Sequence, residues 1–354
     1  MVQVRSRLAR RPLALVGVAV AAAGAPHAAF AQVVPADGGL ASAADRATIV
    51  REALARNPGL KGAAERVQSM RSASRAEGRL PDPELMFQTW QVPFERPLSF
   101  RDSQMVMAGV SQTFPAPGSL SAAARARDDA ATAEEAMLVD RARDLVRDVQ
   151  HAYADLTEGA ARHHAHVDHR GVAARLVAAA QARLAGGGSL DDVAQAELAL
   201  ARIDADVATE VSSIARAKAR LNGLLARPFD APLADPQPGG AATVTLPEAA
   251  LVDLAEHTRP DLRAAEARVQ AERAGLESAQ LQGSLPSFTV GAYYFAPTTN
   301  MPFHGYGVSA SMTLPWVWGG GAQRSAAQDA LVRAGGYDAA DARQRIGVDV
   351  GTAA

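Results

Sequence analysis

Histidines concentrate in one stretch of the sequence where a helix is expected, and their spacing suits a metal ion. His163, His166 and His169 follow each other at three-residue intervals, so each lies beside the next along a helix. Imidazole pairs at such spacing bind zinc or copper, and Asp168 could add an oxygen ligand. Fixed metal sites usually draw ligands from more than one segment, however, and a solvated helix face also tolerates histidine. Two interpretations therefore stay open, a metal site and an ordinary polar helix face.

Methionines form a second group that could do metal chemistry, because the thioether is a soft ligand suited to Cu(I). They fall in or beside segments that have the pattern of β-strands: Met86, Met105, Met107, Met301 and Met312. The alternative role is apolar lining that faces lipid or a lumen. From the residues alone, a soft-metal role for these methionines is only a hypothesis.

The motifs of the common enzyme classes are absent from the sequence. It contains no Gly-rich phosphate loop, no Gly-x-Ser-x-Gly elbow and no His-Glu-x-x-His. The run Gly186-Gly187-Gly188-Ser189 precedes a helix, but no strand leads into it and no lysine follows. The absence of cysteine excludes disulfides, thiolate metal sites and a cysteine nucleophile. The formal net charge of −2 excludes a global basic field for nucleic acid. We expect neither a catalytic site nor a cofactor.

The elements around these residues are long helices. A helical pattern runs from Leu120 to Leu184, which corresponds to roughly 100 Å. The glycine run ends it, and Ser189 caps a second helix. That helix carries apolar residues at strict seven-residue spacing: Val193, Leu200, Val207, Ile214 and Leu221. This heptad pattern predicts an antiparallel coiled-coil hairpin whose turn spans 186–191.

The N-terminal segment has the three parts of a secretory signal peptide. Arginines between Arg5 and Arg11 precede an apolar stretch from Leu13 to Ala23, and Ala29-Phe30-Ala31 supplies small residues for cleavage before Gln32. The apolar run is about half of the ~20 residues that a membrane-spanning helix needs. We therefore expect residues 1–31 to be a signal peptide and the mature chain to leave the cytoplasm.

The rest of the chain repeats itself once at an offset of about 200 residues, a period far too long for a solenoid. The matched segments are Arg66-Val67-Gln68 with Arg268-Val269-Gln270, Leu80-Pro81 with Leu285-Pro286, and 111–115 with 311–315. We expect a first repeat (32–226), a Pro- and Gly-rich linker (227–245) and an incomplete second repeat (246–354). The expected elements are a helical hairpin (118–226), helices at 259–284 and 320–350, and strands at 84–92, 103–114, 287–295 and 304–314.

Most of the aromatic residues lie in or next to these strands, although Phe, Tyr and Trp make up only 5% of the chain. The last strand alternates, with Tyr306, Val308 and Ala310 on one face and Gly307 and Ser309 on the other. Strands of about ten residues with one apolar face and rings at their ends are typical of lipid-facing β-barrels. Since about eight strands are the practical minimum for a barrel, the four strands of one chain predict an oligomer.

The order of these motifs along the chain, together with the duplication, resembles that of the TolC-like outer-membrane efflux protein family. The resemblance covers the chain from about Ala47 to Val350 and rests on four segments: 53–58, 80–83, 109–115 and the hairpin tip, 186–193. It implies a mainly α fold with β, in which a periplasmic α-barrel of coiled-coil helices joins a trimeric 12-strand outer-membrane β-barrel. It also implies an outer-membrane channel subunit of a tripartite efflux system, similar to the components of heavy-metal RND systems. Together with the methionines, this resemblance favours metal-ion export as a hypothesis, and drugs or other small solutes are equally allowed.

The resemblance further implies partners and a docking surface. The expected partners are two more copies of the chain in a homotrimer, a periplasmic adaptor (membrane fusion) protein, an inner-membrane RND pump and outer-membrane lipid, with no nucleic acid. The docking surface would comprise Gly187, Ser189, Leu190, Asp192 and Val193. The alternative for these residues is a turn and helix cap without a partner.

The chain departs from the family pattern in its second repeat, which stops some 30 residues into its long helix. The second helical hairpin is missing, so we expect a C-terminally truncated or frameshifted chain. Three further interpretations stay open: a soluble periplasmic coiled-coil scaffold, a type I secretion duct in the outer membrane, and a periplasmic metal-storage protein built on the histidines.

Overall fold

The computed structural model describes residue 40 and residues 45–237 and 246–353. The expected signal peptide (1–31) and positions 238–245 of the expected linker lie outside the described residues. The residues from Leu40 onward belong to one unit, whose elements follow.

The first half of this unit begins with the helices α1 (Arg46–Arg56) and α2 (Pro58–Glu77). The strands β1 (Glu84–Trp90) and β2 (Met105–Phe114) follow, with the short 3-10 helix η1 (Phe100–Asp102) between them. The long helix α3 (Ser119–Ala185) and the returning helix α4 (Leu190–Leu224) complete this half.

The second half repeats the same order of elements up to the long helix. It contains α5 (Glu248–Thr258), α6 (Pro260–Ser284), β3 (Phe288–Ala296), β4 (Gly305–Met312) and α7 (Gly320–Ala353). The helix–helix–strand–strand–helix order therefore occurs twice, which confirms the internal duplication predicted from the sequence.

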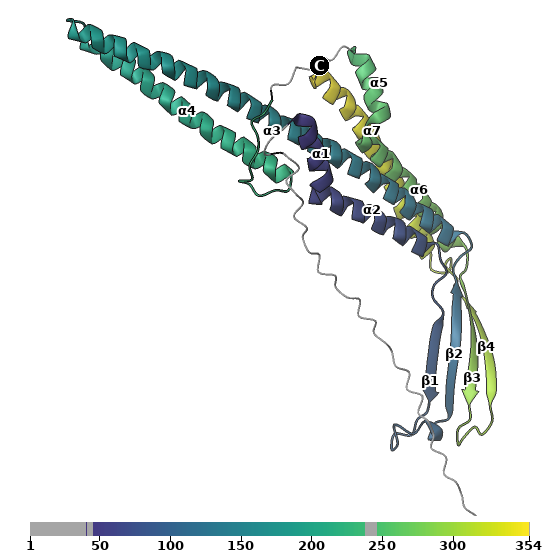
Figure 1. The fold of residues 1–354 in the computed structure, drawn as a ribbon. Coiled ribbons are helices and arrows are strands. Elements are labelled where there is room, and N and C mark those ends of the chain that lie inside the picture. The colour runs from purple at the N-terminus through teal and green to yellow at the C-terminus, as the bar shows by residue number, and fades with distance from the viewer. Residues whose placement is uncertain (1–39, 41–44, 238–245, 354) are drawn as a thin grey trace, which may run out of the picture. The chain divides into compact units, whose positions relative to one another are not determined.

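The strands form one antiparallel sheet in the order β1-β2-β3-β4, in which β2 and β3 join the two copies (Figure 1). The register pairs Phe87 with Ala108, Val110 with Ala292, and Tyr294 with Tyr306. Since β2 and β3 are separated in the sequence by the α3–α4 hairpin, the sheet brings the two copies side by side.

Three of the four strands are slightly shorter than predicted, each because of the local backbone at one end. β1 ends at Trp90 and not at residue 92 because Gln91 has a φ of 49°, which interrupts extended backbone. β2 begins at Met105 and not at residue 103 because η1 precedes it and Ser103 Oγ donates to Phe100 O at 2.6 Å. β4 ends at Met312 because the chain turns, with Val317 N donating to Leu314 O.

The helices pack side by side around α3. The second part of α3 pairs with α4, and its first part contacts α2 and α6, while α7 packs on α6 (Figure 1). Ion pairs mark these contacts: Arg170 with Asp204 between α3 and α4 at 2.5 Å, and Arg125 with Glu277 between α3 and α6 at 2.6 Å. The single helix α3 therefore runs beside two shorter helices, α4 along its second part and α2 along its first.

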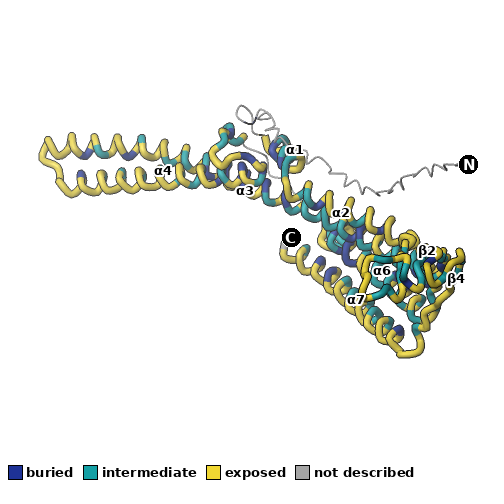
Figure 2. Tube along the Cα trace, turned by 90° about the horizontal axis from the view of Figure 1, so that it is seen from below, coloured by how far each residue is buried: buried dark blue, intermediate teal, exposed yellow. Residues whose placement is uncertain are grey.

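Two apolar clusters hold the helices together. The larger one lies where α1, α3, α4 and the segment after α4 meet, and includes Ile49, Val149, Leu156, Leu221 and Leu233. The smaller one joins α6 to α7 through Leu262, Ala265, Ala342 and Ile346. Away from these clusters, the far end of the α3–α4 hairpin is mostly exposed (Figure 2).

Within the described ranges, none of the helices combines the length and apolarity needed to cross a membrane.

Candidate functional site

The sheet has two chemically different faces, which follow from its register. One face, called here the apolar face, carries the even-numbered residues of β2, β3 and β4 and the odd-numbered residues of β1. Its apolar members are Leu85, Phe87, Val106, Ala108, Val110, Phe114, Phe288, Val290, Ala292, Tyr294, Ala296, Tyr306, Val308, Ala310 and Met312, and it also carries the polar residues Thr89 and Gln112. Several are strongly exposed, with Leu85 at 86% and Val308 at 75%. Large apolar side chains on an uncovered face mark a surface that another apolar medium or molecule covers.

The opposite face, called here the small-polar face, carries glycine and hydroxyl residues over much of its area. Thr113 and Thr289 share a hydrogen bond between their hydroxyls at 2.9 Å across β2 and β3. Tyr293 and Ser309 do the same across β3 and β4 at 3.0 Å. This face is less exposed than the apolar one, and it offers water or a polar solute a row of hydroxyl groups.

Glycines on the small-polar face make room for aromatic rings. A Cβ at position 109 would lie 2.1 Å from Cδ1 of Tyr293, and one at position 291 would lie 2.5 Å from its hydroxyl oxygen. On the next strand, Gly307 faces the ring of Phe295, with a Cβ–Cε2 separation of 3.0 Å. The rings of Tyr293 and Phe295 therefore occupy the space beside glycines.

Rings also mark both ends of the strands. At the end near the helices, Phe114, Phe288, Trp316 and Trp318 are exposed, Trp318 to 93%. At the far end, Trp90, Phe94, Phe303 and Tyr306 are exposed, Phe94 to 99%. The apolar face thus lies between two rows of aromatic residues, which is the pattern expected where a sheet meets two lipid–water interfaces.

The connections at the far end are hydrogen-bonded to each other. Thr299 N donates to Arg101 O at 2.8 Å, and Asn300 Nδ2 donates to Asp102 O at 3.2 Å. Ser99 Oγ donates to Asp102 at 2.7 Å and thereby lowers the pKa of that carboxyl, with help from Arg96. The β1–β2 and β3–β4 connections therefore form one linked rim.

The tip of the α3–α4 hairpin is a glycine turn with a helix cap. Gly187 has a φ of +92°, which L side chains rarely adopt, and Ser189 Oγ accepts a hydrogen bond from Asp191 N at 3.1 Å. Gly187, Ser189, Leu190 and Asp192 are exposed, Leu190 to 70%. Val193 differs, because its side chain is only 7% exposed and packs inside the hairpin. It supports the tip and does not present a surface in this chain.

Comparisons with known proteins add the decisive observation about the fold. No protein-family model matches the sequence, and no curated protein sequence matches it significantly. Solved structures do match. The outer membrane protein VceC of Vibrio cholerae superposes with a TM-score of 0.69 over 85% of this chain and 75% of its own, at 21% identity. The chain has the fold of the TolC-like outer-membrane channels.

Two further channels support this assignment. CusC gives a TM-score of 0.68 over 87% of this chain and 75% of its own, at 18% identity. The CmeC outer membrane channel of Campylobacter jejuni gives 0.68 over 84% and 67%, at 14% identity. The fold predicted from the sequence motifs is therefore confirmed.

On the helices of this channel fold, the predicted histidine site is not assembled. His163 and His166 are half-buried, His169 is exposed, and the rings of His166 and His169 meet edge to face with centroids 6.4 Å apart. Among the described residues, no group of three or more His, Asp or Glu side chains is placed to hold a metal ion. Metal binding by His163, His166 and His169 thus stays a prediction without a preformed ligand set.

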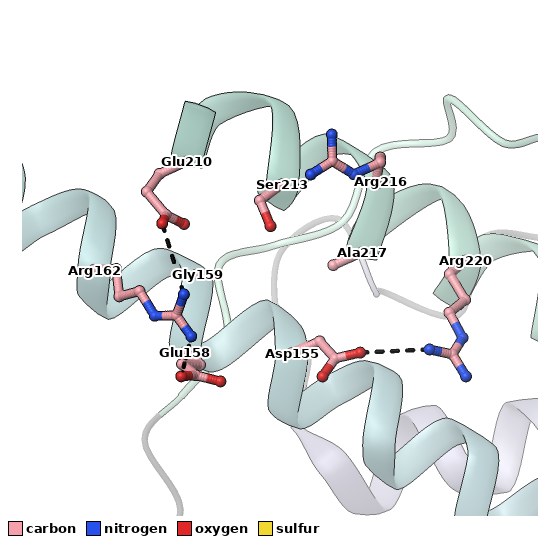
Figure 3. A pocket seen from close by; sticks show the side chains of 9 residues that line it. All are labelled: Asp155, Glu158, Gly159, Arg162, Glu210, Ser213, Arg216, Ala217 and Arg220. Atoms are coloured by element: carbon pink, nitrogen blue, oxygen red, sulfur yellow. Dashed lines mark hydrogen bonds and ion pairs between the residues drawn. The ribbon is translucent and has the colours of Figure 1, made fainter. Parts of the chain in front are cut away.

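A charged hollow of about 270 Å³ lies between α3 and α4 in the channel fold, close to the larger apolar cluster. Figure 3 shows that both acidic and basic side chains line this hollow. Arg162 forms ion pairs with Glu158 and Glu210, and Arg220 forms one with Asp155 at 3.4 Å. Since each of its carboxylates is paired with an arginine, the hollow has no free acid–base pair for catalysis. It is an ion-paired seam of the hairpin.

Sequence reasoning missed the arrangement of side chains on the small-polar face. Alternation within a strand can be read from the sequence, but the residues that face each other across strands depend on register. The available signal was a glycine two residues from an aromatic residue in the same strand, as in Gly291 and Tyr293.

Proposed function

We propose that this chain is a subunit of a trimeric outer-membrane duct, which passively exports metal ions or small toxic solutes for a tripartite efflux system. The observation that carries the proposal is the two-faced sheet between two rows of aromatic residues. In a bilayer the apolar face would contact lipid and the small-polar face would line a water-filled lumen.

The dimensions of the sheet fit this role. β2 has 10 residues, which gives a strand about 33 Å long. A tilt of about 40° reduces its height to about 25 Å, the height of the apolar band of outer-membrane barrels.

The number of strands supports an oligomer. Four strands cannot close a barrel, and β1 and β4 have free edges in one chain, which neighbouring subunits would pair. Three copies would supply twelve strands. The helices would then extend into the periplasm, and the exposed hairpin tip at Leu190 would meet an adaptor protein joined to an inner-membrane pump.

The neighbours support a transport role without catalysis, because the solved structures with this fold are described as outer-membrane proteins and channels. We infer no enzyme activity and no cofactor. Of the possible cargoes, a small solute is taken further below.

The proposal is tested by an arginine on each face of β4. We expect Val308→Arg to abolish the heat-sensitive trimer in detergent extracts of outer membranes, because a charge near the middle of a lipid-facing strand costs about 2–4 kcal/mol. Ser311→Arg, on the small-polar face, should leave the trimer intact and reduce solute efflux.

If the chain were a soluble periplasmic scaffold, the opposite result would be expected for Val308→Arg. Val308 is exposed in the single chain, so Val308→Arg would then be harmless, and a high-salt wash would remove the protein from membranes. That outcome would overturn the duct.

The docking surface is tested with single cysteines, since the chain has none of its own. With a cysteine-reactive photo-crosslinker in whole cells, Leu190→Cys should give a cross-link to a periplasmic adaptor, and the buried control Val193→Cys should not. Equal labelling of both would contradict a specific docking surface.

A further inference from the structure

A hollow of about 560 Å³ lies at the junction where the helices meet the sheet (Figure 1). Its lining comes from the end of α2, the start of α3, the end of α6, the segments before β3 and after β4, and the first turns of α7. Of the strand residues, Thr113 lines it, and Thr113 belongs to the small-polar face of the sheet. The volume is within the range of small-molecule sites, and the hollow adjoins the face that would line the lumen.

Much of the lining is apolar. It is formed by leucines and prolines from both copies of the repeat: Pro115, Leu120, Leu285, Leu314 and Pro315. Leu314 is 46% exposed in the single chain. Covering such surface with the apolar part of a ligand is favourable, because it removes this surface from water.

The charged side chains in the lining are Arg324 of α7 and Glu77 of α2, and both are exposed. Within the part of the chain that the structure describes, neither side chain has an ion pair or a hydrogen bond. Arg324 is an exception on its helix, because the other arginines of α7 each pair with a carboxylate: Arg333, Arg343 and Arg345. The hollow thus contains a guanidinium whose donors are free for a ligand.

Ser119 adds a second donor without a partner. Its residue is 1% exposed and lines the hollow, and its hydroxyl has no hydrogen-bond partner among the described residues. The hydroxyl of the neighbouring Ser278 differs, because it donates to Ser119 O at 3.2 Å. Ser119 also begins α3, the positive end of a long helix, where Gly118 supplies no side-chain cap. A buried unpaired hydroxyl at a helix start indicates a negatively charged partner, and a single bound water is the competing explanation.

We propose that this hollow binds an amphipathic organic anion, with an apolar body and one carboxylate or similar group. The apolar body would lie against the leucines and prolines, and the anionic group would accept hydrogen bonds from Arg324 and Ser119. Glu77 would repel a second negative charge, so a monoanion is favoured over a dianion. That such an anion is cargo in a lumen rests on the proposed function, whereas the binding itself does not.

Three compounds with the same ring system isolate the role of charge: 2-naphthoate, 2-naphthylmethylamine and 2-naphthalenemethanol. Each would be titrated by calorimetry into the full-length protein in lipid nanodiscs at about pH 7, where a carboxylate is charged. Empty nanodiscs give the blank for partition into lipid. We expect saturable binding of naphthoate, one per chain, at least about tenfold tighter than that of the amine or the alcohol.

Variants then assign the anionic group to its donors. Arg324→Gln should weaken naphthoate binding by at least about tenfold and leave the alcohol unaffected. Arg345→Gln makes the same change on the same helix outside the hollow, and this matched control should bind as the wild type does. Glu77→Gln should tighten naphthoate binding, because a repulsive charge is removed. Ser119→Ala should weaken it about threefold without lowering the melting temperature, because its hydroxyl has no protein partner to lose.

Three results would overturn the site. The first is no saturable binding above the nanodisc blank, as expected if water or a second copy of the chain fills the hollow. The second is an equal effect of Arg324→Gln and Arg345→Gln. The third is equal affinity for naphthoate and the alcohol, which would show an apolar hollow without preference for an anion. Trimer formation, measured on the same samples, reports separately on the duct.

Discussion

The two copies of the repeat begin their second helix with the same backbone and different side-chain chemistry. Asn57 precedes Pro58 and Arg259 precedes Pro260, with φ/ψ of −57°/118° and −68°/127°. Asn57 caps its own helix by accepting a hydrogen bond from Leu60 N at 3.1 Å. Arg259 makes no cap and binds Asp261 at 2.7 Å and Asp349 of α7 at 2.6 Å. The first copy uses a local bond here, and the second uses a bond between helices.

The apolar clusters near these two helix starts also differ, and the cluster of the first copy is the larger. In the first copy α4 and the segment after it add Leu221, Leu225 and Leu233 to the cluster around Val149. In the second copy no described helix returns along α7, and the cluster contains little beyond Leu262 and Ile346. Among the described residues, the capped helix start of the first copy adjoins a large apolar cluster, whereas the second copy ties α6 to α7 with the Arg259–Asp349 ion pair.

The largest expected effect comes from removing the apolar contacts themselves. Leu221→Ala should destabilise the first copy by about 3–5 kcal/mol, because Leu221 is fully buried and a cavity would remain. Ile346→Ala, equally buried in the smaller cluster, should cost less, about 2 kcal/mol, because α7 can shift toward α6. Thermal unfolding of helical signal in detergent measures both. An equal loss would mean that the two cores are equivalent despite their sizes.

The next effect concerns Gly109 and Ser309, which occupy equivalent positions in the two copies and lie on either side of Tyr293. Gly109→Ser should cost about 1–3 kcal/mol, because its Cβ would overlap the Tyr293 ring and force it to move. Ser309→Ala loses one hydrogen bond to the Tyr293 hydroxyl and should cost about 1 kcal/mol.

The temperature at which the trimer dissociates on unboiled gels measures both variants. As a control, Gly109→Ser/Tyr293→Ala should recover part of the loss caused by Gly109→Ser, since it removes the overlapping ring. No recovery would contradict the steric explanation.

Arg259→Gln and Asn57→Ala distinguish the long-range bond from the local cap. Each should cost about 1–2 kcal/mol, but their salt dependence should differ. Hydrogen bonding to Asp261, and then to Asp349, raises the pKa of Arg259, so the guanidinium stays charged throughout the accessible range. The wild-type advantage over Arg259→Gln should shrink between 0.05 and about 1 M salt as the charges are screened, whereas the advantage over Asn57→Ala should not. Equal salt dependence would mean that Arg259 acts mainly through packing.

The sequence predicted the elements and the duplication because both leave local patterns. Heptads marked α4, the glycine run marked the hairpin tip, and two-residue alternation marked β4. It could not place the Arg259–Asp349 ion pair or bring Arg324 and Ser119 to one hollow, because such contacts depend on helix packing and strand register over long separations. Val193 is a different case, because its place in the heptad series already favoured the inside of the hairpin, where it is buried, over a docking surface.

The smallest effect concerns Asp140 of α3, whose equivalent on α7 is the exposed Asp341. Partial burial, and then the charges of Asp144 and Asp261, raise the pKa of Asp140. The native state therefore holds this proton more tightly than the unfolded state, so its contribution favours folding at low pH and is lost as the pH rises above about 4.

Asp140→Asn removes the charge and should raise stability at pH 7 by less than about 1 kcal/mol, with the gain disappearing near pH 4. Asp341→Asn, which loses only an exposed pair with Arg345 at 3.2 Å, should be nearly neutral. Melting temperatures of the two variants across this pH range decide the matter. A loss of stability in Asp140→Asn at pH 7 would mean that Arg259 and Arg143 outweigh burial, and that the first copy also relies on a charge at this junction.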